Sequence, residues 1–347
     1  MNNKTPQSIH LEKILTFAIV IIMVITIGFA LYYLKAILMP FIVAILLSYI
    51  FYPGIQKLYK KFKIPRAVSI IILCVIIFFL TMLLGTFLFK NINEFIGAWP
   101  AYQKELEASF VNFYSQLHLS QQDIFLVADN IFKNISFSSS VSVAITSSVV
   151  FLTNVFITLL FMVFLLFSAH TFPDRISRAF SKERADKIKN IIKNINEQVE
   201  KYLLIKTFIS LFTGLSVYLI LSLINIKFAF LWGVVAFFLN YIPNVGSFVA
   251  GIPPILTAFL QFDLTKALVV LLVFAGIQFF WGNIVEPLVI GKRLNLSPIV
   301  ILFALLFWFQ LWGVVGAIIA VPLTAIIKIV FSNIEGLKPI AILVSDK

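Results

Sequence analysis

Residues 67–89 read AVSIIILCVIIFFLTMLLGTFLF and contain no charged side chain. A helix needs about 20 consecutive apolar residues to cross the hydrocarbon core of a bilayer, so this stretch is predicted to be a transmembrane helix. The segment directly before it, Gln56–Arg66, holds five basic residues and no acidic one. Because short basic loops stay in the cytoplasm, the helix is expected to begin on the cytoplasmic side of the membrane.

The composition of the whole chain extends this prediction. Of the 347 residues, 61% are hydrophobic and 12% are charged, and the mean hydropathy is +1.03. Soluble domains contain about 25% charged residues, so lipid has to be the solvent for most of the chain. The expected fold is an all-α polytopic membrane protein with about eight transmembrane helices, some of them interrupted or re-entrant in the C-terminal third. The net charge of +12 lies in loops that flank the spans, which makes the lipid bilayer the expected partner and argues against nucleic acid.

Five segments of different character follow one another along the chain. Residues 90–142 hold three basic and five acidic residues and are expected outside, whereas residues 172–206 hold nine basic and five acidic residues and are expected in the cytoplasm. Short amphipathic helices are predicted in the first of these segments and one amphipathic helix in the second. Both termini are then expected in the cytoplasm, and the expected location is a cell inner membrane. The predicted segments are the first three transmembrane helices (1–89), an extracytoplasmic amphipathic insert (90–142), the fourth transmembrane helix (143–168), a cytoplasmic amphipathic linker helix (169–202), and C-terminal transmembrane helices with breaks that form a transport pathway (203–347).

The final third of the chain is irregular. The stretch Asn240–Gly246 reads NYIPNVG and interrupts an apolar run. Such a break at membrane depth is tolerated only where protein or a water-filled cavity surrounds it, although a plain loop between two spans is the alternative. Residues 228–260 form either a hairpin, which places Lys292 and Arg293 inside, or one crossing with a loop, which places them outside. The sequence LWGVV occurs at 231–235 and again at 311–315, either by chance or as part of a structural repeat.

Glu286 is the only acidic residue between Asp263 and Glu335. An acid at membrane depth is expensive and points to function, so Glu286 is a candidate for binding a cation or taking up a proton. The alternative places it among the headgroups, paired with Lys292 or Arg293.

Signatures of catalysis and of metal or cofactor binding are missing from the sequence. Cys74 is the single cysteine, and the three histidines are scattered without ligand spacing. No nucleotide-binding loop or catalytic motif is present. We therefore expect neither an enzyme nor a metal site nor a cofactor.

Three ordered motifs carry a resemblance to a known family. They are Leu239–Gly246, then Glu286–Lys292 leading to Leu296-Ser297-Pro298, then Trp312–Gly316 followed by Val321-Pro322-Leu323. Together they resemble the autoinducer-2 exporter family, also called PerM-like permeases. The resemblance implies about eight membrane helices, a homo-oligomer and the export of small solutes. Members are associated with autoinducer-2, a furanosyl signalling molecule, and in other branches with exchange of sodium or lithium for protons.

The breaks and the resemblance together give a set of predicted pathway residues. Two asparagines come from the sequence pattern alone, and the remaining residues match the motifs of the family. The set is Asn240, Pro243, Asn244, Gly246, Asn283, Glu286, Pro287, Gly291, Pro298, Gly313, Gly316 and Pro322.

Three functions remain open at this point. The leading hypothesis is a permease that exports a small polar solute resembling autoinducer-2. The second is a sodium or lithium/proton antiporter that uses Glu286. The third is a non-transporting scaffold that recruits partners through residues 90–142 and 172–206.

Overall fold

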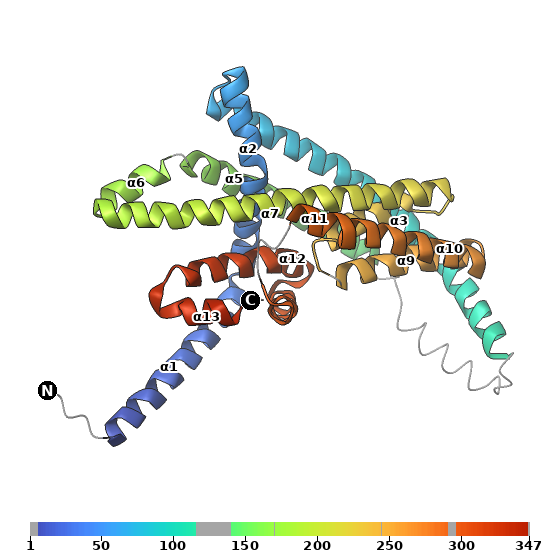
Figure 1. Cartoon of the computed structure of the whole chain (residues 1–347). Coiled ribbons are helices and arrows are strands. Elements are labelled where there is room, and N and C mark those ends of the chain that lie inside the picture. Colours follow the sequence, from blue (N-terminus) through green and yellow to red (C-terminus); the bar gives the residue numbers. More distant parts are fainter. Residues whose placement is uncertain (1–5, 116–139, 170, 244, 291–295, 346–347) are drawn as a thin grey trace.

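The structure, a computed structural model, describes residues 6–115, 140–169, 171–243, 245–290 and 296–345. Within these ranges the regular elements are helices, and one isolated antiparallel bridge pairs Leu296 with Ser345. The elements, shown in Figure 1, are α1 (Pro6–Tyr33), α2 (Lys35–Phe62), α3 (Arg66–Ser115), α5 (Ser140–Ala169), α6 (Phe172–Ala179), α7 (Lys182–Leu223), α8 (Ala229–Leu239), α9 (Val245–Gln261), α10 (Leu264–Gln278), the π-helix η1 (Phe279–Val285), α11 (Glu286–Ile290), α12 (Pro298–Ser332), the 3-10 helix η2 (Glu335–Leu337) and α13 (Lys338–Leu343). The predicted all-α fold is confirmed.

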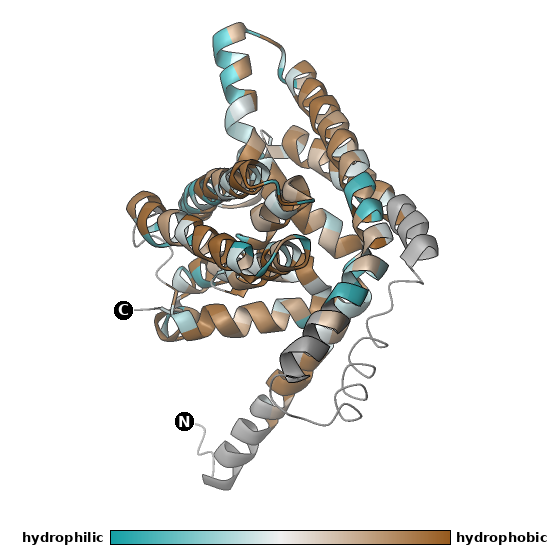
Figure 2. Cartoon of the chain, turned by 90° about the vertical axis from the view of Figure 1, so that its right-hand side faces the viewer, coloured by the Kyte–Doolittle hydropathy of each residue, from teal (hydrophilic) through white to brown (hydrophobic). Residues whose placement is uncertain are grey.

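Among the residues that the structure describes, six helical runs are long and apolar enough to cross a membrane. They are α2, most of α3, the C-terminal part of α5, α7, the run from α10 to α11, and α12. Large apolar side chains face outward from them, such as Phe79, which is 67% exposed, and Figure 2 shows long hydrophobic stretches along the helices. Apolar surface of this extent is stable in lipid and not in water, which confirms the polytopic membrane fold. Beside these six runs, the apolar part of α1 and the helices α8 and α9 are apolar but shorter.

The α8–α9 pair is a closed helical hairpin. α8 has 11 residues, so at about 1.5 Å per residue it is about 17 Å long and too short to cross the roughly 30 Å hydrocarbon core. The side chain of Gln261, at the end of α9, accepts a hydrogen bond from the Lys227 N–H (2.8 Å) and donates one to the Asn225 carbonyl (2.8 Å). Both ends of the hairpin therefore lie together, just beyond the C-terminal end of α7. The predicted interrupted helices are confirmed, and residues 228–260 adopt the hairpin of the two arrangements considered.

α7 is the helix on which the rest of the C-terminal half assembles, and it crosses the middle of the molecule in Figure 1. Its contact with α8 is close because two glycines face each other. A Cβ atom at Gly214 would lie 2.6 Å from the Gly233 carbonyl oxygen, and a Cβ atom at Gly233 would lie 2.8 Å from the Gly214 carbonyl oxygen. Small residues at a crossing let two backbones approach in a membrane, which sets the position of α8 along α7.

Two helices continue across predicted segment boundaries, α3 across the boundary at residues 89 and 90 and α7 across the boundary at residues 202 and 203. α7 has 42 residues and joins the amphipathic linker segment to the next transmembrane helix without interruption, and α3 has 50 residues and continues to Ser115 where short helices were expected. A change from apolar to polar side chains does not end a helix, because the backbone hydrogen bonds continue regardless of which solvent surrounds them. Residues 116–139 of the predicted insert lie outside the described residues.

The second broken helix is α12. Gly313 has φ 64° and ψ −146°, a conformation that residues with a Cβ atom rarely adopt. After this break the chain passes so close to the Trp308 carbonyl that only a glycine fits at Gly316. The two LWGVV stretches thus differ in structure, because Gly233 lies inside regular α8 while Gly313 forms a break.

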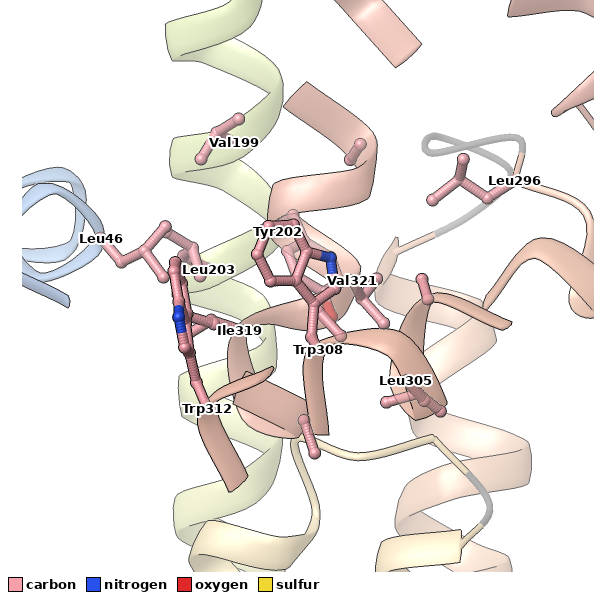
Figure 3. Packing of buried hydrophobic residues seen from close by; sticks show 14 residues of the cluster. Leu46, Val199, Tyr202, Leu203, Leu296, Leu305, Trp308, Trp312, Ile319 and Val321 are labelled. Atoms are coloured by element: carbon pink, nitrogen blue, oxygen red, sulfur yellow. The ribbon is translucent and has the colours of Figure 1, made fainter. Parts of the chain in front are cut away.

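The broken α12 packs against α7 through a cluster of buried apolar side chains. Figure 3 shows Tyr202 and Leu203 of α7 beside Trp308, Trp312 and Val321 of α12. The Trp312 indole N–H also donates to the carbonyl of Leu31 in the last turn of α1 (3.0 Å). This cluster attaches α1 and α12 to the central helix.

Candidate functional site

A buried ion pair joins α7 to α11. The Nζ atom of Lys206 lies 2.7 Å and 2.8 Å from the two carboxylate oxygens of Glu286. The Lys206 side chain is 3% exposed and that of Glu286 is 25% exposed. Lys206 is the last residue of the basic segment 172–206, and in the structure its side chain is buried within the apolar part of α7 and points to Glu286. Glu286 thus has a partner on another helix, while Lys292 and Arg293 lie outside the described residues.

The π-helix η1 delivers Glu286 to this position. It occupies Phe279–Val285, directly between α10 and Glu286. A π-helical turn contains extra residues, so it rotates the side chains that follow relative to a regular α-helix, and such turns are common at functional sites. The Trp281 indole N–H donates to the Ser216 hydroxyl of α7 (3.1 Å) and holds η1 against that helix. The run from α10 to α11 therefore lies antiparallel to α7, with Trp281 opposite Ser216 and Glu286 opposite Lys206.

The tip of the α8–α9 hairpin binds the same stretch of α7. The Asn240 side-chain amide donates to the Ser210 hydroxyl (3.0 Å), and the Tyr241 hydroxyl lies 2.7 Å from that of Thr207. Asn240 and Ser210 are buried. Residues 206, 207 and 210 span little more than one helical turn, so the ion pair and the hairpin tip meet at one level of α7.

The turn at this tip explains two of the predicted residues. The Gly246 Cα faces the Leu239 carbonyl so closely that a Cβ atom would collide with it. The Pro243 carbonyl accepts from the Val245 N–H (2.6 Å), which closes the turn between the helices. Gly246 and Pro243 therefore shape the backbone, and Asn240 provides the polar contact to α7.

The remaining predicted residues fall into two groups. Asn283 and Pro287 flank Glu286 along η1 and α11 and are exposed. Pro298 begins α12, and Gly313, Gly316 and Pro322 lie in α12, where Gly316 and Pro322 are buried. Asn244 and Gly291 lie outside the described residues. The structure thus brings Asn240 and Glu286 to one site on α7, whereas the glycines and Pro322 of α12 belong to the helix that packs on α7 through the apolar cluster.

Four residues at the site were not among those predicted: Lys206, Thr207, Ser210 and Tyr241. A signal for Lys206 is present in the sequence, because it is the only charged residue in the stretch 203–224. The hydroxyl groups of Thr207 and Ser210 carry no such signal, since both residues are common in transmembrane helices.

A family profile described as AI-2E family transporter matches residues 18–336. The chain belongs to the AI-2E transporter family. The "AI-2 transport protein TqsA" of Escherichia coli (strain K12) is 33% identical over 316 residues, which cover 89% of this chain and 90% of that protein. A "Putative transport protein" of Borreliella burgdorferi is 29% identical over 332 residues, covering 94% of this chain and 89% of its own length. "Putative transport protein YhhT" of Escherichia coli (strain K12) is 31% identical over 284 residues, covering 80% and 79% of the two chains.

Membership of the AI-2E family identifies the chain as a membrane transporter, as the sequence predicted. In the described part of the chain, His, Cys, Asp and Glu side chains form no group of three that could hold a metal ion. The polar side chains that meet around one turn of α7 in this AI-2E transporter carry hydroxyl, amide, ammonium and carboxylate groups.

Proposed function

We propose that this AI-2E transporter is a permease that exports a small polar solute across the bacterial inner membrane, along α7 and past the tip of the α8–α9 hairpin. The observation that carries the proposal is a pair of interhelical polar contacts, Asn240–Ser210 and Tyr241–Thr207, beside the Lys206–Glu286 pair, which has no net charge. Polar contacts gathered at a broken helix between transmembrane segments are the usual construction of a transporter binding site.

The solute that suits these groups is neutral and rich in hydroxyl groups. The hydroxyl and amide groups of Ser210, Asn240 and Tyr241 both donate and accept hydrogen bonds, so a polyhydroxyl solute can replace one of them as partner without leaving the other unpaired. The ion pair has no net charge and so does not favour a charged solute. A furanosyl molecule such as autoinducer-2 has this chemistry, in keeping with the name of the Escherichia coli relative TqsA.

The position of the site along α7 supports outward movement. Lys206 lies three residues after Leu203, where the apolar half of α7 begins, and therefore about 5 Å inside that half. The other half of α7 is basic and amphipathic and is assigned to the cytoplasm by its charge. A solute that enters from the cytoplasm would meet the ion pair first. Both termini cytoplasmic and a homo-oligomeric assembly are parts of the same proposal.

Antiport of a cation and a proton at Glu286 is the second candidate, favoured by the 25% exposure of that side chain. In this mechanism the carboxylate has to leave Lys206 in order to take up a cation, because the Lys206 ammonium group lies within 2.8 Å of both of its oxygens. The permease does not require that step. We therefore place the permease first.

Liposomes that contain the purified protein separate the two candidates. Uptake of autoinducer-2, sodium-dependent proton movement and sodium flux are measured side by side for the wild type and for the double variant Lys206→Met/Glu286→Gln. A permease keeps solute flux in the double variant, since the site stays neutral, whereas an antiporter loses sodium-dependent proton movement. If the wild type moves neither solute nor ions, the non-transporting scaffold is the remaining function.

A further inference from the structure

A hollow of about 340 Å³ opens between α2, α3 and α5, far along the chain from the transport site. Its polar side is formed by Gln56 and Lys60 near the end of α2 and by Arg66 at the start of α3. Its apolar side is formed by buried residues from the three helices, among them Ile55 and Leu166. Figure 2 shows this end of α2 as a hydrophilic stretch that faces the start of the hydrophobic α3.

The two basic residues of this hollow are not neutralised. Among the described residues no acidic side chain forms an ion pair with Lys60 or Arg66. The guanidinium group of Arg66 lies 4.5 Å from the centre of the Tyr59 ring, a cation–π contact that holds it at the rim. A guanidinium group on an aromatic ring keeps its N–H donors available, and their planar arrangement matches the oxygens of a phosphate.

The start of α3 adds to the positive potential at the rim. α3 begins at Arg66, and the first N–H groups of a helix have no partner inside the helix. Their dipoles point toward the same rim and favour an anion there. This contribution supports the basic side chains and does not act alone.

We propose that this hollow binds the phosphate headgroup of an anionic phospholipid from the cytoplasmic leaflet. Basic pockets between transmembrane helices on the cytoplasmic side are suited to such headgroups. The five basic residues of the segment 56–66 assign this end of α2 to the cytoplasm. Lys60 and Arg66 contact the phosphate, and Tyr59 keeps Arg66 in place.

The shape of the hollow favours a lipid over a free phosphate ion. Apolar side chains form one wall of the hollow, and they continue onto the outer surfaces of α3 and α5, where Ile71 is 55% and Phe164 is 65% exposed. An acyl chain can follow that surface directly from the headgroup, and its burial adds a favourable contribution that inorganic phosphate lacks.

Native mass spectrometry of the full-length protein tests the proposal. The protein is titrated in detergent with phosphatidylglycerol, with phosphatidylethanolamine, and with phosphatidylglycerol in the presence of inorganic phosphate. The variant Lys60→Gln/Arg66→Gln removes the two charges of the hollow. The matched control Lys57→Gln/Lys61→Gln removes two charges from the same helix at positions that do not line the hollow.

We expect the wild type and the control to retain one phosphatidylglycerol per chain in preference to phosphatidylethanolamine. Each basic residue near the membrane surface contributes about 1 kcal/mol, so the hollow variant should bind phosphatidylglycerol about thirtyfold more weakly. The single variant Lys60→Gln, which changes an exposed side chain, should weaken binding about fivefold and serves if the double variant does not fold. Equal weakening in the hollow variant and the control would overturn the site, and displacement of the lipid by millimolar inorganic phosphate would overturn the assignment to a lipid.

Discussion

The ammonium group of Lys206 contacts both carboxylate oxygens of Glu286 across 80 residues of sequence. Two other ion pairs, Lys90–Glu94 and Lys193–Glu197, each join exposed residues one turn apart on a single helix. Exposed pairs of that kind contribute little, whereas a buried pair between helices has to be kept intact, because either charge alone would be unpaired in a medium of low dielectric constant. Lys206–Glu286 therefore joins α11 to the same turn of α7 that the tip of the α8–α9 hairpin contacts.

Removing one charge of this pair should destabilise the protein more than removing both. We expect Glu286→Gln and Lys206→Met each to lower the free energy of unfolding by up to about 3 kcal/mol. This is the low end of the cost of breaking a buried ion pair, because the Glu286 side chain is 25% exposed. The double variant should recover much of that loss, since it leaves no unpaired charge. Thermal unfolding in detergent measures all three, and additive losses would show that the two residues do not interact.

The hairpin tip should lose transport activity before it loses stability. Tyr241→Phe removes the hydroxyl that lies 2.7 Å from Thr207 and keeps the ring, so the stability should fall by about 1 kcal/mol. Solute flux into liposomes should fall further if this hydroxyl belongs to the solute site. Tyr218→Phe is the matched control, because it removes a hydroxyl from a tyrosine of α7 that packs on Phe230 at the start of α8, about three helical turns along α7 from Thr207. Equal flux in the two variants would remove Tyr241 from the site.

The close crossing of α7 and α8 should not tolerate one methyl group. In Gly214→Ala the new Cβ atom would lie 2.6 Å from a backbone oxygen of α8, so the helices must separate, at a cost of about 1–3 kcal/mol. Gly276→Ala in α10 adds the same methyl group where nothing lies within 4 Å and should be neutral or slightly stabilising. The melting temperatures of the Gly214→Ala and Gly276→Ala proteins are compared in detergent. Equal values would contradict the close crossing of α7 and α8.

A substitution at Gly313 tests the break in α12 separately from the packing of side chains. Nothing lies within 4 Å of a Cβ atom at this position, yet φ is +64°. Gly313→Ala should therefore cost about 1–3 kcal/mol through backbone strain alone. Gly97→Ala, in the regular helix α3 with equally open space, is the control. A Gly313→Ala protein as stable as this control would mean that α12 can continue without the break.

The contacts of the structure also predict which positions share a side of the membrane. The Ser297 N–H donates to the Val344 carbonyl (3.0 Å), so the start of α12 and the C-terminal segment lie together. In the run from α10 to α11, Glu286 lies near one end and the start of α10 lies at the other end. In a background without Cys74, cysteines at Ser177 and Ser345 should therefore be labelled from the cytoplasmic side and a cysteine at Thr265 from the other side. Labelling of Ser345→Cys and Thr265→Cys from the same side would contradict the hairpin arrangement.

The sequence pattern singles out residues that are rare in their surroundings. Glu286 is unusual because it is the only acid in a long apolar region, and Asn240 is unusual because it opens a break rich in proline and glycine. Thr207 and Ser210 do not differ from other hydroxyl residues of transmembrane helices. Lys206 follows a basic segment, so in the sequence it can be taken for the last residue of that segment. Their roles depend on which helix lies opposite, and a pattern along one chain does not contain that information.

The sequence by itself determined the solvent of this protein and therefore its class. Apolar runs as long as the bilayer is thick, separated by basic and acidic segments, have to form transmembrane helices because unpaired backbone groups are too costly in lipid. Only the tertiary structure decided that residues 228–260 return on themselves, since the hydrogen bonds of Gln261 close the hairpin across more than 30 residues. The tertiary structure also decided that Lys206 and Glu286 neutralise each other, because the Gly214–Gly233 crossing and the π-helix η1 fix the register in which their helices meet.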